Sequence, residues 1–149
     1  MPYLLDTNHC FRLIARDSGM VEAVKSRPAA RLMTSVVVAG ELRYGAAISE
    51  RWRENAAAVE DFLGRIDQTP VSPATAQYYA DLKSRLLSAY GPKNRLQRRN
   101  FDLASLGFSD NDLWIAASAM ERDAIVVTAD GDYARLAEAG TLTVENWLR

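Results

Sequence analysis

With 149 residues, the chain is long enough to bury one sizeable hydrophobic core, and we expect a single domain over residues 1–149. Its composition, 48% hydrophobic and 25% charged, is that of a globular protein, and no apolar run reaches the roughly 18 residues that span a bilayer. The net charge of −1 argues against a protein that coats nucleic acid nonspecifically. Cys10 is the only cysteine, so we expect a buried thiol rather than a disulfide, and with no secretory signal visible we expect a cytoplasmic protein.

The first predicted element is a short strand over residues 3–5 that ends at Asp6. A short apolar run closed by a polar residue is typical of a buried strand. Because ligands and catalytic groups gather at the carboxyl ends of parallel strands, Asp6 is a candidate for an active site. The alternative is that Asp6 only caps the helix expected from about residue 8 to residue 16.

A second short helix, a strand over residues 31–34 and a longer helix over residues 36–48 are predicted next. The longer helix carries Glu41 on or near its apolar side. A glutamate is rarely buried without a partner or a metal ion. Glu41 therefore either belongs to a site or pairs with an arginine such as Arg43 or Arg65.

An amphipathic helix over residues 51–66 has apolar residues spaced three and four apart, beginning with Trp52, and we expect it to be scaffold. A short strand or extended link over residues 67–71 follows it. The next helix is predicted over residues 73–90, with Ser72 as its cap and a proline at its first position.

Residues 91–106 interrupt the helical pattern, and we expect a loop there. The first part of this segment holds four basic residues and no acidic one: Lys93, Arg95, Arg98 and Arg99. A basic cluster in an otherwise neutral chain is a candidate contact for the phosphates of a nucleic acid. The alternatives are a surface for a protein partner and a solvated loop with no such role.

A polar segment then leads into an apolar helix that is predicted to run through Ala119. Ser109, Asp110 and Asn111 are all good capping residues, and Asp112 falls in the first turn, where the helix dipole favours an acid. Because one helix does not need so many polar residues at its start, Asp112 is a second candidate for the site.

The clearest predicted strand covers residues 124–128, and Asp130 and Asp132 follow it directly. This repeats the arrangement at the start of the chain, a buried strand with a carboxylate after it. A helix that stops at Gly140 and a last strand over residues 141–144 complete the predicted elements.

Alternation of strands and helices favours a parallel sheet with helices on both faces. Acidic side chains recur where such a sheet places its sites: Asp6, Glu41, Asp112, Asp130 and Asp132. If the fold gathers them, their repulsion protonates some of them unless a hard cation such as Mg²⁺ or Mn²⁺ is bound. A cluster of acids without histidine or cysteine partners points to phosphate chemistry, in which the metal activates a water for attack on a phosphodiester.

Four segments together resemble the successive motifs of PIN domains, above all those of the VapC toxin ribonucleases of bacterial toxin–antitoxin pairs. They are Leu-Leu-Asp-Thr-Asn8, Gly-Glu-Leu-Arg-Tyr-Gly45, Asp112-Leu-Trp-Ile-Ala-Ala117 and Val-Thr-Ala-Asp-Gly-Asp-Tyr133. The resemblance spans nearly the whole chain, in the correct order. It implies a three-layer α/β/α domain with a central parallel sheet.

The resemblance also implies a Mg²⁺-dependent endoribonuclease that acts on structured RNA such as tRNA or rRNA. It further implies inhibition by a cognate antitoxin, contact with DNA only through that antitoxin, and a homodimer formed through the amphipathic helices. The matching catalytic acids are Asp6, Glu41, Asp112 and Asp130, with the three aspartates as metal ligands and with Asn8 and Asp132 in support. The Leu-Trp-Ile-Ala-Ala run after Asp112 selects it over Asp110, and Asn8 or Thr7 would then cap the first helix in place of Asp6.

Two other functions remain open at this point. The chain can act mainly as a binding module, in a toxin–antitoxin complex that regulates its own operator DNA through the antitoxin. It can also be a small phosphatase-like enzyme with the same type of sheet. That enzyme would need an Asp-x-Asp arrangement after the first strand, and the sequence has Asp6-Thr-Asn8 instead.

Overall fold

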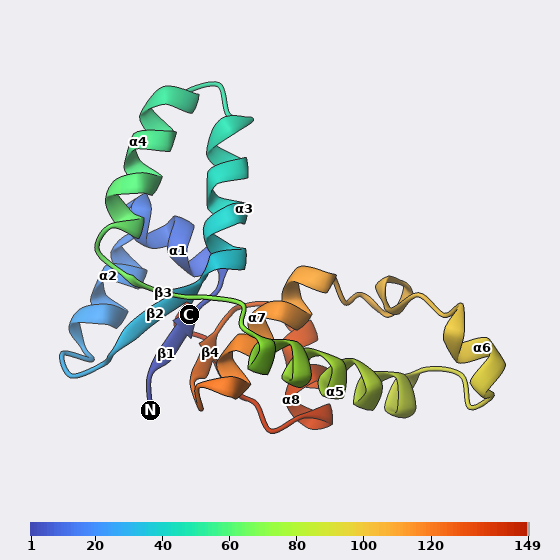
Figure 1. Ribbon diagram of the computed structural model, residues 1–149. Coiled ribbons are helices and arrows are strands. Elements are labelled where there is room, and N and C mark those ends of the chain that lie inside the picture. The colour runs from blue at the N-terminus through green and yellow to red at the C-terminus, as the bar shows by residue number, and fades with distance from the viewer. Residues whose placement is uncertain (149) are drawn as a thin grey trace.

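The structure is a computed structural model that describes residues 1–148, and its sheet within this range is parallel throughout, as predicted (Figure 1). The strands are β1 (Tyr3–Leu5), β2 (Leu32–Ser35), β3 (Asp67–Thr69), β4 (Ile125–Val127) and β5 (Thr143–Glu145), in the order β3-β2-β1-β4-β5. The central strand β1 pairs Leu4 with Met33 on one side and with Val126 on the other. The carboxyl ends of β1 and β4 therefore lie next to each other.

Helices cover both faces of the sheet, with α1 and α2 on one side and α5, α7 and α8 on the other (Figure 1). Their bounds are α1 (Thr7–Ile14), α2 (Ser18–Lys25), α3 (Val36–Ala47), α4 (Trp52–Leu63), α5 (Pro73–Tyr90), α6 (Arg95–Arg99), a 3₁₀ helix η1 (Leu103–Leu106), α7 (Asp110–Glu121) and α8 (Asp132–Ala139). Helix α5 packs against α7 and α8, while α3 packs against α4 and α1. Within the described residues, no helix combines the length and the hydropathy that a membrane crossing requires.

Most predicted helix starts are confirmed by their caps. The Ser35 side chain accepts a hydrogen bond from the Val38 amide, so the β-branched run after it begins a helix rather than a strand. Ser72 forms a capping box with Thr75 at the start of α5. The prediction that Trp52 begins the inner stripe of α4 is wrong, because its side chain stands at the end of the α3–α4 hairpin and is 51% exposed.

The expectation of a loop over residues 91–106 is wrong, because this segment contains α6 and η1. The Asn94 side chain accepts a hydrogen bond from the Leu96 amide and starts α6, and the Asp102 side chain does the same for η1 through the Ala104 amide. Such short helices depend on their caps and have no apolar stripe long enough for a periodicity to reveal. Together with the end of α5 they form an arm that reaches away from the sheet (Figure 1).

The core is built on β1, where Leu4 and Leu5 are fully buried. On the face covered by α5 and α7, the core is completed by three leucines that are almost completely shielded from solvent: Leu82 and Leu86 of α5 and Leu113 of α7. Cys10 is buried as predicted, and burial raises the pKa of its thiol to about 12, so this group is an apolar contact rather than a nucleophile.

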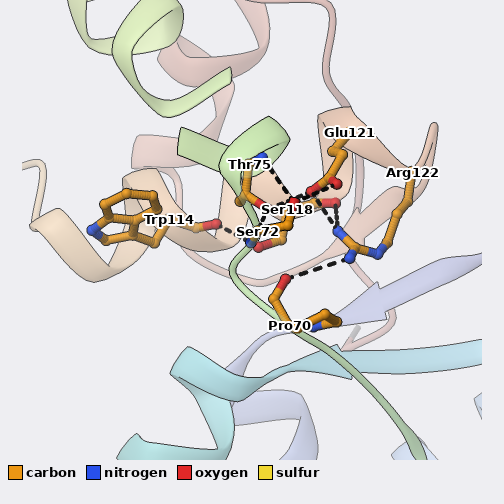
Figure 2. A network of polar contacts seen from close by, with 7 residues as sticks. All are labelled: Pro70, Ser72, Thr75, Trp114, Ser118, Glu121 and Arg122. Carbon is orange, nitrogen blue, oxygen red and sulfur yellow. Dashed lines mark hydrogen bonds and ion pairs between the residues drawn. The ribbon is translucent and has the colours of Figure 1, made fainter. Parts of the chain in front are cut away.

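A polar network joins the end of α7 to the start of α5 (Figure 2). The Glu121 carboxylate accepts hydrogen bonds from the Ser72 hydroxyl at 3.0 Å and from the Thr75 hydroxyl. Arg122 donates to the same carboxylate at 2.7 Å and to the carbonyl oxygen of Pro70 at 3.4 Å. The network fixes the position of α7 along the axis of α5. Because Asp112 lies in the first turn of α7, the network also helps to place Asp112.

Candidate active site

Asp6 lies at the carboxyl end of β1 and is only 7% exposed. Its Oδ1 accepts hydrogen bonds from the backbone amide of His9 at 2.8 Å and from Nδ1 of His9 at 2.9 Å. Asp6 is therefore the N-cap of α1, and the expectation that Asn8 or Thr7 takes over this cap is wrong. Within residues 1–148, the other oxygen, Oδ2, makes no hydrogen bond.

The side chain that contacts Asp6 is His9, which is fully buried, whereas Asn8 is exposed on α1. The imidazole uses Nδ1 toward Asp6, and its Nε2 is buried without a partner in the described part of the chain. The spacing of three residues from a capping aspartate to a histidine in the first turn is the sequence signal that would have pointed to this contact.

Glu41 reaches the same region from α3. Its Oε1 is buried and has no hydrogen-bond partner within the described residues. Arg43 pairs with Glu60 at 2.7 Å and Arg65 with Asp61 at 3.3 Å, so the alternative in which either arginine neutralises Glu41 is wrong. Within residues 1–148, no arginine or lysine therefore forms an ion pair with the Glu41 carboxylate.

The electrostatics of Glu41 show which groups surround it. Burial raises the pKa of its carboxyl above the usual value, and the neighbouring Thr7 hydroxyl opposes this shift. The negative charges of Asp112 and Asp6 then raise the same pKa further. Glu41 therefore lies within electrostatic range of both aspartates.

Asp112 is the third residue of α7, and both of its carboxylate oxygens are held. Oδ2 accepts from the Ser109 amide at 3.3 Å in a capping box, and Oδ1 accepts from the Tyr133 hydroxyl at 3.3 Å. Asp110 points elsewhere, because it accepts from the Tyr79 hydroxyl at 2.8 Å and lies 3.5 Å from the Lys83 ammonium on α5. The geometry separates these two neighbouring acids, and only Asp112 lies near Glu41. We call Asp6, Glu41, Asp112 and Asp130 the acidic cluster.

Asp130 lies in the loop after β4 and Asp132 is the first residue of α8, and their carboxylates make different contacts. Asp130 is exposed, and its Oδ1 accepts from the Asp132 amide at 2.9 Å. The Asp132 carboxylate instead pairs with Arg135 at 2.8 Å. It also lies against Gly107, where the backbone has a φ of +94° and an added Cβ would come within 3.2 Å of Oδ2. Asp132 thus ties α8 to the segment that precedes α7.

The Tyr133 side chain contacts Asp112 and is almost fully buried, with only 1% of its surface exposed. Burial and the charges of Asp112 and Asp6 raise the pKa of its hydroxyl well above the usual value, as do the hydrogen bond to Asp112 and the charge of Asp130. The buried Tyr133 hydroxyl therefore interacts electrostatically with carboxylates from the end of β1, from α7 and from the loop after β4. Nothing in the residue pattern distinguished this tyrosine from an ordinary core residue.

The chemistry of the cluster fits a hard divalent cation. Within residues 1–148, no three side chains of Asp, Glu, His or Cys are gathered closely enough to hold a metal ion as they stand. The cluster nevertheless offers oxygen donors alone, among them the unpartnered Glu41 Oε1, and its members repel one another. Mg²⁺ and Mn²⁺ take such ligands and remove that repulsion, so the donor set suits these ions once the carboxylates are drawn together.

The basic residues of the arm lie apart from the acids, since α6 is at the far end of the arm from the carboxyl ends of the strands (Figure 1). Lys93, Arg95 and Arg99 are exposed. Arg98 is half-buried and donates from Nε to the carbonyl oxygen of Pro92 at 2.7 Å, so it shapes the arm. Three of the four predicted phosphate contacts are therefore accessible to a ligand.

A fold with this sheet order and acids at the ends of β1 and β4 can be compared with known families. The family model described as PIN domain matches residues 3–139. The chain belongs to the PIN-domain family. The match runs from the first residue of β1 to the last residue of α8 and so includes every acid of the cluster.

Individual relatives of this PIN domain carry VapC names. Ribonuclease VapC2 of Haemophilus influenzae is 27% identical over 148 residues, which is 99% of each protein. The tRNA(fMet)-specific endonuclease VapC of Shigella flexneri is 26% identical over 147 residues, 99% of this chain and 98% of that protein. The crystal structure of VapBC2 from Rickettsia felis, bound to a DNA fragment from its promoter, is similar with a TM-score of 0.78 at 25% identity over 99% of both chains. The resemblance to VapC proteins and the α/β/α architecture are thereby confirmed.

Proposed function

We propose that this PIN domain is the ribonuclease toxin of a type II toxin–antitoxin pair, a cytoplasmic endoribonuclease that hydrolyses phosphodiester bonds of structured RNA such as tRNA. The observation that carries the proposal is electrostatic proximity: Glu41 lies within range of Asp6 and Asp112, and the Tyr133 hydroxyl lies within range of Asp6, Asp112 and Asp130. The ribonuclease and tRNA endonuclease names of full-length relatives support the reaction and the substrate class.

Three aspartates, Asp6, Asp112 and Asp130, would hold Mg²⁺, with Mn²⁺ as a substitute. When bound, the ion supplies an activated water and neutralises the charge that develops on the phosphate. Asp6 presents Oδ2 because its Oδ1 is occupied by His9. Glu41 suits the role of general base, because its raised pKa brings it closer to neutral pH and its Oε1 has no competing partner.

The arm supports the binding of a polyanion. The exposed Lys93, Arg95 and Arg99 can contact phosphates without reading a sequence, which suits the positioning of a structured RNA. The arm leaves the sheet from the end of α5, so a ligand bound to it and to the acids would have to be long. A folded RNA meets this requirement.

A cognate antitoxin is the proposed protein partner, with operator DNA contacted only through it and a homodimer formed through the amphipathic helices. The similarity to a VapBC2 complex on promoter DNA supports this partner. The same similarity favours a second candidate function, in which the chain serves mainly as a subunit of an autoregulatory complex. The two functions can coexist in one protein.

The substitution Asp6→Asn separates the two functions. Asparagine caps a helix about as well as aspartate, so the variant keeps α1 and the surface that a partner would bind. We expect it to lose Mg²⁺-dependent cleavage of tRNA while it still forms a complex with the co-expressed antitoxin. Cleavage by Asp6→Asn at the wild-type rate would rule out the proposed site, and loss of the complex together with cleavage would show that the variant is misfolded.

A further inference from the structure

The Tyr133 hydroxyl has a position that packing alone does not explain. The side chain belongs to the first turn of α8, and its ring is part of the buried core. The hydroxyl leaves that core and donates to Oδ1 of Asp112 at 3.3 Å. A buried hydroxyl costs free energy unless it is hydrogen-bonded, and a phenylalanine would fill the same core volume without that cost.

The hydroxyl completes the restraint on the Asp112 carboxylate. The final torsion of an aspartate side chain is broad, so a carboxylate held at one oxygen can still turn. In this PIN domain Oδ2 is held by the Ser109 amide at 3.3 Å, and Oδ1 is held by Tyr133. The two donors come from different elements, one from the N-cap of α7 and the other from the first turn of α8, and each holds a different oxygen, so rotation of the carboxylate is restrained.

The same hydroxyl lies within electrostatic range of acids from three parts of the chain. Asp112, Asp6 and Asp130 all act on it electrostatically, and its proton is the neutral donor among them. A donor at this point lowers the repulsion among the aspartates without adding a positive charge that would compete with a cation. Arg135, the cation next along α8, is turned instead toward Asp132 and the carbonyl oxygen of Leu106.

We propose that Tyr133 is a positioning residue whose hydroxyl holds the Asp112 carboxylate in the orientation that binds a divalent cation. The inference rests on the proposed function, because it assigns Tyr133 a role within the same acidic site. Groups that orient metal ligands in this way typically account for about 10-fold to 100-fold in metal affinity or activity.

The test is the isosteric substitution Tyr133→Phe, with Mn²⁺ affinity measured by calorimetry on the full chain without RNA. We expect about 10-fold weaker binding, with a circular dichroism spectrum and a cooperative melt like those of the wild type in EDTA. Tyr90→Phe is the matched control, since the Tyr90 hydroxyl also donates to a carboxylate, that of Glu138 at 3.1 Å, and packs near α8 but away from the acids. We expect Tyr90→Phe to bind Mn²⁺ as the wild type does.

Activity gives a second measurement. If Tyr133 acts through Asp112, Tyr133→Phe should need about 10-fold more metal for half-maximal cleavage of tRNA, while the KM for tRNA stays unchanged. Unchanged Mn²⁺ affinity in Tyr133→Phe, or an equal loss in Tyr90→Phe, would overturn the inference. A wild-type chain that binds Mn²⁺ but cleaves no RNA would instead overturn the proposed function, and the calorimetric comparison would still decide the role of Tyr133.

Discussion

The two oxygens of the Asp6 carboxylate have different surroundings. Its Oδ1 caps α1 and accepts from His9, while its Oδ2 is free of hydrogen bonds within the described residues. The residue pattern posed capping and catalysis as alternatives, since both fit an aspartate at the end of a strand. In the structure the cap leaves room for a role in the site, because it occupies only Oδ1 of Asp6.

Glu41 should cost the protein stability in the absence of metal. The folded state raises the pKa of this carboxyl above its usual value of 4.5, so ionisation is disfavoured by folding. The cost is absent below about pH 4.5 and grows as the pH rises toward the folded-state pKa. We expect Glu41→Gln to increase the free energy of unfolding by about 1 kcal/mol at pH 7 in EDTA, as measured by urea denaturation.

Glu60→Gln is the control for this prediction. Glu60 is a glutamate in the neighbouring helix α4, and its hydrogen bond with Arg43 lowers the pKa of its carboxyl. Its replacement should bring no gain in stability at pH 7. A Glu41→Gln variant that is less stable than the wild type under the same conditions would contradict the assignment of Glu41 as a carboxylate without an ion pair.

Among the elements, the position of Asp112 depends on how α7 packs on α5. The two helices are joined at a junction formed by the hydrogen bonds of Glu121 with Ser72 and Thr75. Burial alone would raise the pKa of Glu121, but the hydroxyls of Thr75 and Ser72 and the charge of Arg122 lower it overall. A lowered folded-state pKa contributes stability above the unfolded value of about 4.5, and this stability is lost as the pH falls through the folded-state pKa. The junction is therefore sensitive to acid.

We expect Glu121→Gln to lower the free energy of unfolding by about 1–3 kcal/mol at pH 7, because it weakens charge-assisted hydrogen bonds that are partly shielded from solvent. The difference from the wild type should shrink when denaturation is repeated near pH 3.5. Asp81→Asn breaks an exposed pair with Arg85 on the outside of α5 and should change the stability little. A pH-independent effect of Glu121→Gln would argue that the carboxylate charge is irrelevant to the junction.

The arm is the second element with a testable role. Replacing Lys93, Arg95 and Arg99 together by glutamine should weaken RNA binding and reduce the slope of log K against log salt by up to about 2–3, since each lost phosphate contact accounts for about 0.7–0.9. Filter binding of tRNA to an Asp112→Asn background at several salt concentrations measures this slope without cleavage. An unchanged slope would leave the arm to a protein partner or to no ligand.

At the scale of the whole molecule, the order of elements followed from hydrophobic periodicity and from residues that start and stop helices. Ser35, Ser72 and Gly140 marked element ends correctly, because capping depends on the residues next to the helix. The two short helices of the arm escaped prediction, since they depend on single side-chain caps.

The site was only partly predictable for a different reason. Asp6 and Asp130 follow predicted strands, and Asp112 lies in the first turn of a helix that begins with more polar residues than a cap needs, so all three could be proposed from the sequence. The contact of His9 with Asp6 spans only three residues and was open to prediction from that spacing, whereas the contact of Tyr133 with Asp112 spans 21 residues and exists only when the chain is folded. Pairwise geometry, rather than residue type, identifies such supporting groups.

The central claim is that the acids gathered around Tyr133 form a metal-dependent site for RNA cleavage. Its most direct test is the rate of tRNA cleavage by the purified chain as a function of Mg²⁺ concentration, in the wild type and in the variants Asp112→Asn and Asp110→Asn. We expect metal-dependent cleavage that falls by at least about 100-fold in Asp112→Asn and persists in Asp110→Asn, because the Asp110 carboxylate contacts Tyr79 and Lys83. Equal cleavage by the wild type and Asp112→Asn, or cleavage that persists in EDTA, would contradict the claim.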